Sequence, residues 1–153
     1  MNIAMGADHG GFTLKEELKT WLAGNGHRLF DAGTDSLESV DYPDFVGDVV
    51  ENVLSGAADR GILICGSGIG MSITANRYHG IRAALCLDPE MARLSRQHND
   101  ANVLVLAGRK TDEETAKAIV DTWLTTDFEG GRHVPRIRKI ELLKPPPNTP
   151  LHK

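Results

Sequence analysis

The most informative segment of the 153-residue sequence is residues 61–70, which read GILICGSGIG. Residues 62–65 are apolar without a break, as expected for a strand that is buried on both faces of a parallel sheet. Three alternating glycines, Gly66, Gly68 and Gly70, follow at once and open a helical segment. In such a loop the backbone N–H groups can point at an anion, and the dipole of the helix adds to their field.

Outward from this segment, short apolar strands alternate with amphipathic helical stretches. The strands are expected at residues 3–5, 28–30, 61–65, 81–87 and 103–106. This alternation predicts right-handed βαβ units and a three-layer α/β/α sandwich. The pair Thr13 and Glu16 fits a capping box at the start of the first helix, and Asp112 is a suitable N-cap for a late helix.

The chain reads as one domain, residues 1–144. A last helix is expected from about residue 134 to 143. The segment that follows begins with Lys144 and three prolines, which cannot continue a helix. We therefore expect a proline-rich tail at residues 145–153, extended or disordered.

Composition excludes several classes of protein. Hydrophobic residues make up 41% and charged residues 25%, which is typical of a globular protein. The formal net charge is −4, so the chain has no overall positive field that would favour non-specific binding of nucleic acid. No apolar run approaches the length of a membrane span, and the first residues lack the pattern of a signal peptide. Two cysteines imply no disulfide framework. We expect a soluble, cytoplasmic protein.

Chemically active side chains adjoin the predicted strands. In open α/β sheets, ligands bind beyond the carboxyl ends of the strands. Residues 6–11 follow the first strand, 65–72 follow the third, 96–100 precede the fifth and 107–109 follow it. We expect these segments to converge on one edge of the sheet.

The glycine loop does not match the standard nucleotide motifs. Met71 stands where the GxGxxG fingerprint needs its last glycine, and a Walker loop would need a Gly-Lys-Ser/Thr run. Cys65 ends the strand beside the helix N-terminus, a place that favours the thiolate. A small buried hydrophobic residue is an equally valid interpretation of Cys65. Cys86 lies within an apolar run and is expected in the core.

Other candidates have two interpretations each. His98 at a helix end is either a histidine stabilised by the helix dipole or a catalytic residue. For Asp8 and His9, which lie in a glycine-rich loop after a strand, a functional role is favoured over a structural one. Zinc bound by Cys65, His9 and His98 is conceivable, but no closely spaced pair of ligands supports it. Arg132 and Arg136, spaced i, i+4, either clamp a phosphate or form a solvated face.

Together the motifs resemble the ribose-5-phosphate isomerase type B family, which also includes galactose-6-phosphate and allose-6-phosphate isomerases. The resemblance covers residues 2 to about 140, in order. The matching segments are residues 8–12, 14–15, 41–43, 65–70, 76–77, 80–83, 95–102 and 129–133. The resemblance implies a metal-free, cofactor-free aldose–ketose isomerase of the pentose phosphate pathway, with a five-stranded parallel, Rossmann-like sheet, working as a homodimer or a dimer of dimers.

The resemblance also assigns roles to residues. Cys65 is similar to the general base that moves a proton between C1 and C2, and His98 to the acid that assists ring opening. A branch of the family uses a glutamate after the loop instead, but Met71 is not acidic here. Ser67 stands where the family has a serine or threonine near the ring oxygen, and it is counted with the catalytic residues. The residues that resemble the anion hole and the sugar contacts are Gly66, Ser67, Gly68, Ile69, Gly70, Asp8, Asn99 and Tyr42. Those that resemble the phosphate grip are His9, Arg132, Arg136 and Arg109, with Arg109 expected from a neighbouring subunit.

Three alternatives remain open. The first, within the same reaction class, is an isomerase of a six-carbon sugar such as allose 6-phosphate or galactose 6-phosphate. One more carbon changes the discrimination between two sugar substrates by only a few kcal/mol. A non-catalytic module that binds a sugar phosphate or a nucleotide is the competing class, although it would need no base at Cys65 and no acid at His98. A purely structural protein would not need the polar cluster at one sheet edge.

Overall fold

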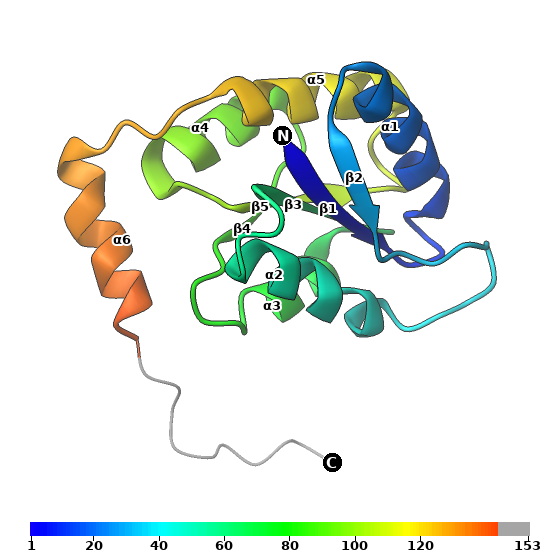
Figure 1. The fold of residues 1–153 in the computed structure, drawn as a ribbon, viewed down its shortest axis with the longest axis horizontal. Coiled ribbons are helices and arrows are strands. Elements are labelled where there is room, and N and C mark those ends of the chain that lie inside the picture. Colours follow the sequence, from blue (N-terminus) through cyan, green and yellow to red (C-terminus); the bar gives the residue numbers. More distant parts are fainter. Residues whose placement is uncertain (144–153) are drawn as a thin grey trace, which may run out of the picture.

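The computed structural model describes residues 1–143, which form a five-stranded sheet between two layers of helices (Figure 1). The strands are β1 (Asn2–Ala7), β2 (Arg28–Asp31), β3 (Arg60–Cys65), β4 (Ala83–Leu85) and β5 (Val103–Ala107). Their order is β2-β1-β3-β5-β4, and every neighbouring pair is parallel. The predicted parallel α/β/α sandwich is therefore confirmed. The expected tail at residues 145–153 lies outside the described residues, and so does Lys144.

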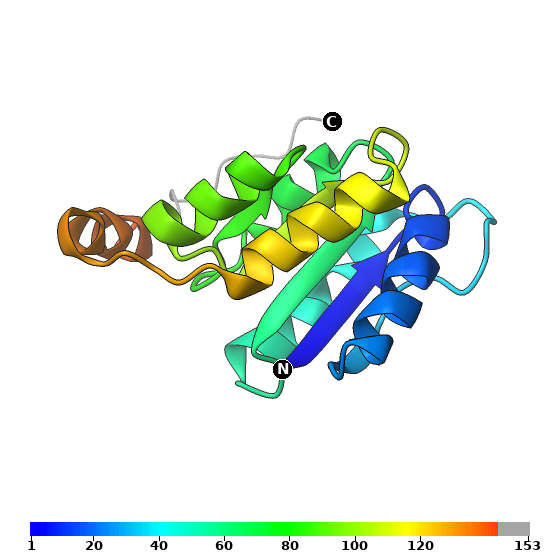
Figure 2. The same cartoon turned by 90° about the horizontal axis from the view of Figure 1, so that it is seen from above.

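Helices cover both faces of the sheet (Figures 1 and 2). On one face lie α1 (Phe12–Gly24), α4 (Pro89–Asn99) and α5 (Glu113–Thr125). On the other lie α2 (Gly47–Leu54), α3 (Ile69–Ala75) and the short 3₁₀ helix η1 (Tyr42–Phe45). A second 3₁₀ helix, η2 (Gly131–His133), leads into α6 (Val134–Glu141), which extends away from the body. Among residues 1–143, no helix combines the length and the apolar character needed to cross a membrane.

The alternation of side chains along β3 divides the core in two. Ile62 and Ile64 pack with the layer of α1 and α5, whereas Leu63 and Cys65 pack with the layer of α2 and α3. Successive side chains of a strand point to opposite faces, so a strand between two helical layers must be apolar at every position. This confirms the interpretation of residues 62–65 as a strand buried on both faces.

Two local predictions have different outcomes. Asp112 caps α5 as expected, because its Oδ1 accepts the N–H of Thr115 at 2.9 Å. The capping box at Thr13 is wrong: α1 begins at Phe12, so Thr13 already lies inside the first turn. The preceding N–H of Gly11 is instead bound by the Asp8 carboxylate, 3.1 Å away. Asp8 thus binds the N–H of the N-cap residue, which is the contact that the capping box would assign to the glutamate.

The chain order places a ligand site between β1 and β3. From β1 the chain moves outward to β2 and then returns across β1 to β3, so the crossovers diverge at this point. Loops that leave neighbouring strands in opposite directions open a crevice at the carboxyl ends of those strands. Asp8 follows β1 and Gly66 follows β3, so the first and second predicted segments both lie at this crevice.

Candidate active site

The loops after β1, β3 and β5 are held together by direct backbone contact. A Cβ on Gly108 would lie 2.5 Å from the carbonyl oxygen of Gly10, and a Cβ on Gly10 would lie 2.9 Å from the nitrogen of Gly66. The N–H of Gly108 donates to the carbonyl of Cys65 at 2.8 Å, and the N–H of Arg109 donates to that of Gly66 at 3.1 Å. Glycine is required here because any side chain would force these loops apart.

These loops surround a pocket of about 440 Å³ at the carboxyl edge of the sheet. Its lining residues are Asp8, Tyr42, Cys65, Gly66, Ser67, Gly70, Arg109 and Lys110. All except Lys110 were expected at the site from the sequence. Lys110 gave one usable signal, its position directly after Arg109 in the loop that follows β5. Arg109 reaches the pocket from its own chain, so the expectation that it crosses from a neighbour is wrong.

The two cysteines have different surroundings. Cys65 is the last residue of β3 and is 4% exposed, with its exposed part in the pocket. Cys86 is 1% exposed, and burial raises the pKa of its thiol to about 11. Its sulfur lies 3.9 Å from the hydroxyl of Ser95, inside the core. The prediction that Cys86 is a core residue is confirmed, and Cys65 is the thiol that a ligand can approach.

The loop after Cys65 provides hydrogen-bond donors and a platform for an aromatic ring. Within residues 1–143, the N–H groups of Ser67, Gly68 and Gly70 donate to no protein acceptor, whereas that of Ile69 donates to the Ser67 hydroxyl at 3.3 Å. The ring of Tyr42 lies directly on Gly70, since a Cβ there would come within 2.6 Å of the ring. The loop can therefore bind an anion beneath the tyrosine.

His9 follows Asp8 in the loop after β1 and is held by a backbone hydrogen bond. Its Nδ1 accepts the N–H of Val40 at 3.2 Å, which joins the loop after β1 to the loop after β2. An imidazole that accepts at Nδ1 carries its proton on Nε2 when neutral. Nε2 is therefore a donor, as contact with a phosphate oxygen requires.

His98 and Asn99 do not join the pocket of their own chain, which corrects the expected convergence on one edge. They end α4, and β5 begins a few residues later at Val103, whereas Cys65 is paired with Ala107 at the opposite end of β5. Four residues of extended strand span about 13 Å. The physical reason is that α4 runs antiparallel to the strands, so its C-terminus returns to the amino edge of the sheet.

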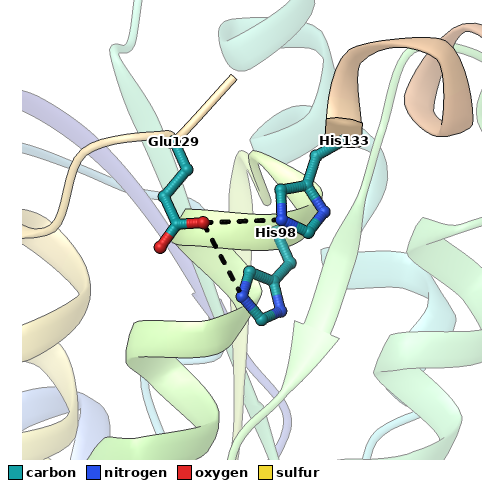
Figure 3. Close-up of side chains that lie close together, drawn as sticks. All are labelled: His98, Glu129 and His133. Carbon is teal, nitrogen blue, oxygen red and sulfur yellow. Dashed lines mark ion pairs between the residues drawn. The ribbon is translucent and has the colours of Figure 1, made fainter. Parts of the chain in front are cut away.

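At that amino edge His98 belongs to a second cluster, which also holds Glu129 and His133 (Figure 3). The imidazoles of His98 and His133 stack with their centroids 4.4 Å apart and their planes 13° from parallel. Glu129 Oε2 lies 4.0 Å from Nε2 of His98 and 3.5 Å from Nε2 of His133. Glu129 and His133 belong to a motif seen in the sequence, but no role was predicted for either.

Positive charge surrounds this cluster. Arg132 in η2 and Arg136 in α6 are both exposed, and Arg132 Nε donates to His133 Nε2 at 3.4 Å. Burial lowers the pKa of His133, and the charges of His98, Arg132 and Arg136 lower it further, against the opposing effect of Glu129. The expected arginine pair thus accompanies His98 and lies apart from Cys65.

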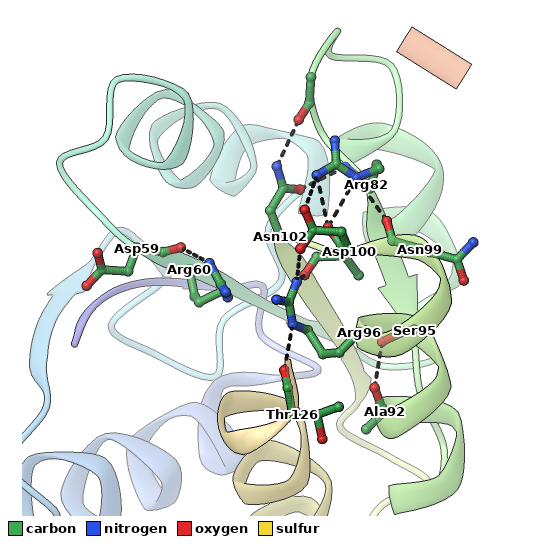
Figure 4. Close-up of polar contacts among 12 residues, drawn as sticks. Asp59, Arg60, Arg82, Ala92, Ser95, Arg96, Asn99, Asp100, Asn102 and Thr126 are labelled. Carbon is green, nitrogen blue, oxygen red and sulfur yellow. Dashed lines mark hydrogen bonds and ion pairs between the residues drawn. The ribbon is translucent and has the colours of Figure 1, made fainter. Parts of the chain in front are cut away.

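Part-buried polar contacts fix the end of α4 (Figure 4). Asp100 has a left-handed backbone, with φ of 45°, and its Oδ1 accepts from Arg96 Nη1 at 2.7 Å. Arg82 Nη2 donates to the Asp100 carbonyl at 2.9 Å, and Arg82 Nη1 donates to Glu141 Oε1 at 2.5 Å. These contacts hold His98 at a defined position and attach α6 to the body.

Comparison with known proteins agrees with this geometry. A family model described as Ribose/Galactose Isomerase matches residues 3–140. The chain is 49% identical to "Ribose-5-phosphate isomerase B" of Escherichia coli (strain K12) over 93% of this chain and 95% of that protein. It is 40% identical to "D-erythrulose-4-phosphate isomerase" of Pectobacterium atrosepticum, over 92% of this chain and 93% of that protein.

Among solved structures, a ribose 5-phosphate isomerase from Thermotoga maritima superposes with a TM-score of 0.92 at 59% identity. The superposition covers 93% of this chain and 98% of that one. Both the fold and nearly the full length are therefore shared with these relatives. The chain belongs to the Ribose/Galactose Isomerase family.

Proposed function

We propose that this protein is an aldose–ketose isomerase that interconverts D-ribose 5-phosphate and D-ribulose 5-phosphate through an enediolate. The observation that carries the proposal is Cys65, an approachable thiol at the end of β3, beside a loop with unpartnered N–H donors. Relatives of nearly equal length bear the name of this activity, at 49% identity for the protein from Escherichia coli. The reaction requires a general base, hydrogen-bond donors for the enediolate oxygen, and residues that bind the phosphate.

In the proposed mechanism Cys65, as thiolate, removes a proton from one of the two carbons C1 and C2 and returns it to the other. The negative charge that develops on the enediolate oxygen is stabilised by the unpartnered N–H groups of Ser67, Gly68 and Gly70. Such donors act strongly because they are already oriented before charge develops. Asp8, Ser67 and Tyr42 line the same pocket and contact the sugar.

The acid reaches this pocket from a second copy of the chain. His98 is separated from Cys65 of its own chain by the length of β5, so in this proposal a neighbouring subunit presents His98, Asn99, Arg132 and Arg136. His98 then protonates the ring oxygen on opening. His9 and Arg109 of the first chain hold the phosphate together with the two arginines of the second, which deliver bidentate contacts to the dianion.

Exposed apolar side chains support assembly into a dimer or tetramer. They lie on α3, α4 and α6 and in the segments that follow α3, β4 and α6, and they are Ile73, Tyr78, Leu87, Met91, Ile140, Leu142 and Leu143. Large apolar side chains left exposed in these segments support a protein–protein contact here. We also propose a cytoplasmic location, supported by two cysteines that form no disulfide.

The substrate has alternatives of different length. Allose 6-phosphate and galactose 6-phosphate extend the sugar by one carbon, and the relative from Pectobacterium atrosepticum is named for a four-carbon phosphate. One carbon changes binding by only about 1–3 kcal/mol in an apolar contact, so side activity on the neighbouring lengths is expected. The ribose substrate is preferred because relatives with that name have the higher identities.

The test compares wild type, Cys65→Ala and the matched control Cys86→Ala in the presence of EDTA. Ketose formation is measured with ribose 5-phosphate, and allose 6-phosphate and the four-carbon substrate are assayed in parallel. Wild type and Cys86→Ala should turn over ribose 5-phosphate fastest, and Cys65→Ala should lose at least about 10²-fold. Equal rates for Cys65→Ala and wild type would reject Cys65 as the base. No turnover of any of the sugars would reject the activity.

A further inference from the structure

The cluster of His98, Glu129 and His133 has the donor set and the spacing of a metal site (Figure 3). One ligand atom from each residue lies within 4.8 Å of the other two. In a tetrahedral zinc complex, with bonds of about 2.0–2.1 Å, neighbouring donors are about 3.3 Å apart. The distances of 3.5 Å and 4.0 Å from Glu129 Oε2 to the two Nε2 atoms are close to that value. Because the two rings are stacked nearly parallel, both imidazoles must turn about their Cβ–Cγ bonds before their Nε2 lone pairs converge on one ion.

The cluster is also supported on several sides. His133 is buried, and the stacked ring of His98 rests against it, so both Nε2 atoms face the same carboxylate. The N–H of Glu129 donates to the carbonyl of Gln97 at 3.1 Å, which joins its segment to α4 next to His98. A metal ion would therefore meet ligands whose backbones are already in place, which reduces the entropy lost on binding.

The ligands select a class of ion. Two imidazoles and one carboxylate suit zinc, cobalt or nickel, whereas magnesium and calcium prefer oxygen ligands alone. Two groups oppose binding. The positive charge of Arg136 lies near His133, and Arg132 Nε donates to His133 Nε2 at 3.4 Å, a contact that must break when the ion arrives. Arg132 is exposed, so its side chain can turn into solvent.

We propose that His98, Glu129 and His133 bind one divalent transition-metal ion per chain, and that this ion holds the isomerase inactive by engaging His98. A nitrogen lone pair that is bound to a metal cannot carry the proton that ring opening requires. The inhibition rests on the role proposed above for His98, whereas the metal site itself does not. Zinc would thus act as a reversible inhibitor, removed by a chelator.

Binding is measured by titrating the full chain with zinc chloride in a calorimeter. The background is Cys65→Ala, which removes the pocket thiol as a competing ligand. We expect one zinc per chain, and affinity at least about tenfold weaker when Glu129→Gln or His133→Asn is added, since even second-shell changes cost 10- to 100-fold. Arg132→Ala should tighten binding. His79→Asn, a histidine outside the cluster that contacts the Glu141 carbonyl, is the control and should change nothing.

Two further readouts connect the ion to His98. The ring-proton NMR signal of His98, assigned with His98→Asn, should shift on addition of zinc. Zinc should lower the activity of wild type, EDTA should restore it, and Glu129→Gln should keep a larger fraction of its own rate at the same zinc concentration.

Three results would overturn the proposal: no zinc binding in the Cys65→Ala background, equal affinity in the ligand variants, or an unshifted His98 signal. Zinc binding with a shifted His98 signal, in a protein that isomerises no sugar, would reject the proposed function and retain the site.

Discussion

Mixing two inactive variants should restore activity if the active site is shared between subunits. The variants are Cys65→Ala, which lacks the base, and His98→Asn, which lacks the acid. Each is expected to be inactive alone. In a mixed dimer, one of the two sites receives wild-type Cys65 from one chain and wild-type His98 from the other.

The expected recovery follows from the structure. Cys65 is paired with Ala107 at the carboxyl end of β5, and His98 precedes the amino end, so about 13 Å of strand separates the two edges. A proton transfer needs heavy atoms within about 3 Å, so the pair cannot act on one substrate within a chain. After random exchange of an equal mixture, half of the sites have an intact base and half of those an intact acid. The activity should therefore reach about one quarter of wild type.

The assay measures ketose formation after the two variants are mixed, unfolded in urea and refolded together. A matched control mixes Cys65→Ala with the double variant Cys65→Ala/His98→Asn, which contains no wild-type Cys65 and should stay inactive. Wild type carried through the same refolding sets the reference rate. Recovery no greater than in the control, with wild type refolding normally, would refute the shared site.

Three further outcomes are expected. Gly70→Ala should lower kcat/KM by about 10²-fold with little change in Tm. The added Cβ would come within 2.6 Å of the Tyr42 ring and displace it. An unchanged kcat/KM would contradict the contact between Tyr42 and Gly70. Iodoacetamide should label Cys65 and leave Cys86 unlabelled, as measured by peptide mass spectrometry. Cys86 is buried and its pKa is about 11, so its thiol stays protonated. Ribose 5-phosphate should slow the labelling of Cys65. Asp31→Asn should lower the free energy of unfolding at pH 7 by about 1.5 kcal/mol in urea titrations. It removes the 2.6 Å partner of the buried Lys15 ammonium, while Glu16 keeps its contact with that ammonium at 2.7 Å.

The same carboxylate predicts a pH dependence. Burial raises the pKa of Asp31, but its hydrogen bonds to Lys15 and Lys19 outweigh that effect, so the pKa is lower in the folded state. A carboxyl with a lowered folded-state pKa contributes stability that is complete above its unfolded pKa of about 3.9 and is lost as the pH falls through its folded value. Wild type should therefore lose more stability than Asp31→Asn between pH 5 and pH 3, and parallel losses would contradict the pairing.

The layers of the fold were predictable because their causes are local. The strand of residues 62–65 is apolar at every position, and only a sheet covered on both faces requires that. The helix at Asp112 was equally predictable, since the capping carboxylate and the first turn are neighbours in sequence. β4 runs from Ala83 to Leu85 and is shorter than the expected strand of residues 81–87. The prediction was too long because apolar residues continue on both sides of the three positions that pair with β5.

The candidate site was only partly predictable because it depends on distant contacts. Cys65 and the glycine loop follow from strand order, since the loops after parallel strands meet at one edge. The seating of Tyr42 on Gly70 joins two segments whose approach no pattern indicates. The expectation for His98 was wrong for a clear reason. Residues that follow a parallel strand lie at the carboxyl edge of the sheet, but His98 precedes β5. It ends α4, which runs antiparallel to the strands, and therefore lies at the amino edge.

This division of the chemistry explains why assembly and activity should be inseparable. One edge of the sheet holds Cys65 and the glycine loop, and the other holds His98 with the two arginines. In the proposed mechanism each chain therefore carries complementary halves of the site. A twofold axis that brings the amino edge of one chain to the carboxyl edge of its partner must also do the reverse. In the proposed dimer one interface thus completes two sites, whereas a single chain completes none. A substitution that prevents association should abolish catalysis while leaving Cys65, its loop and the pocket around them intact.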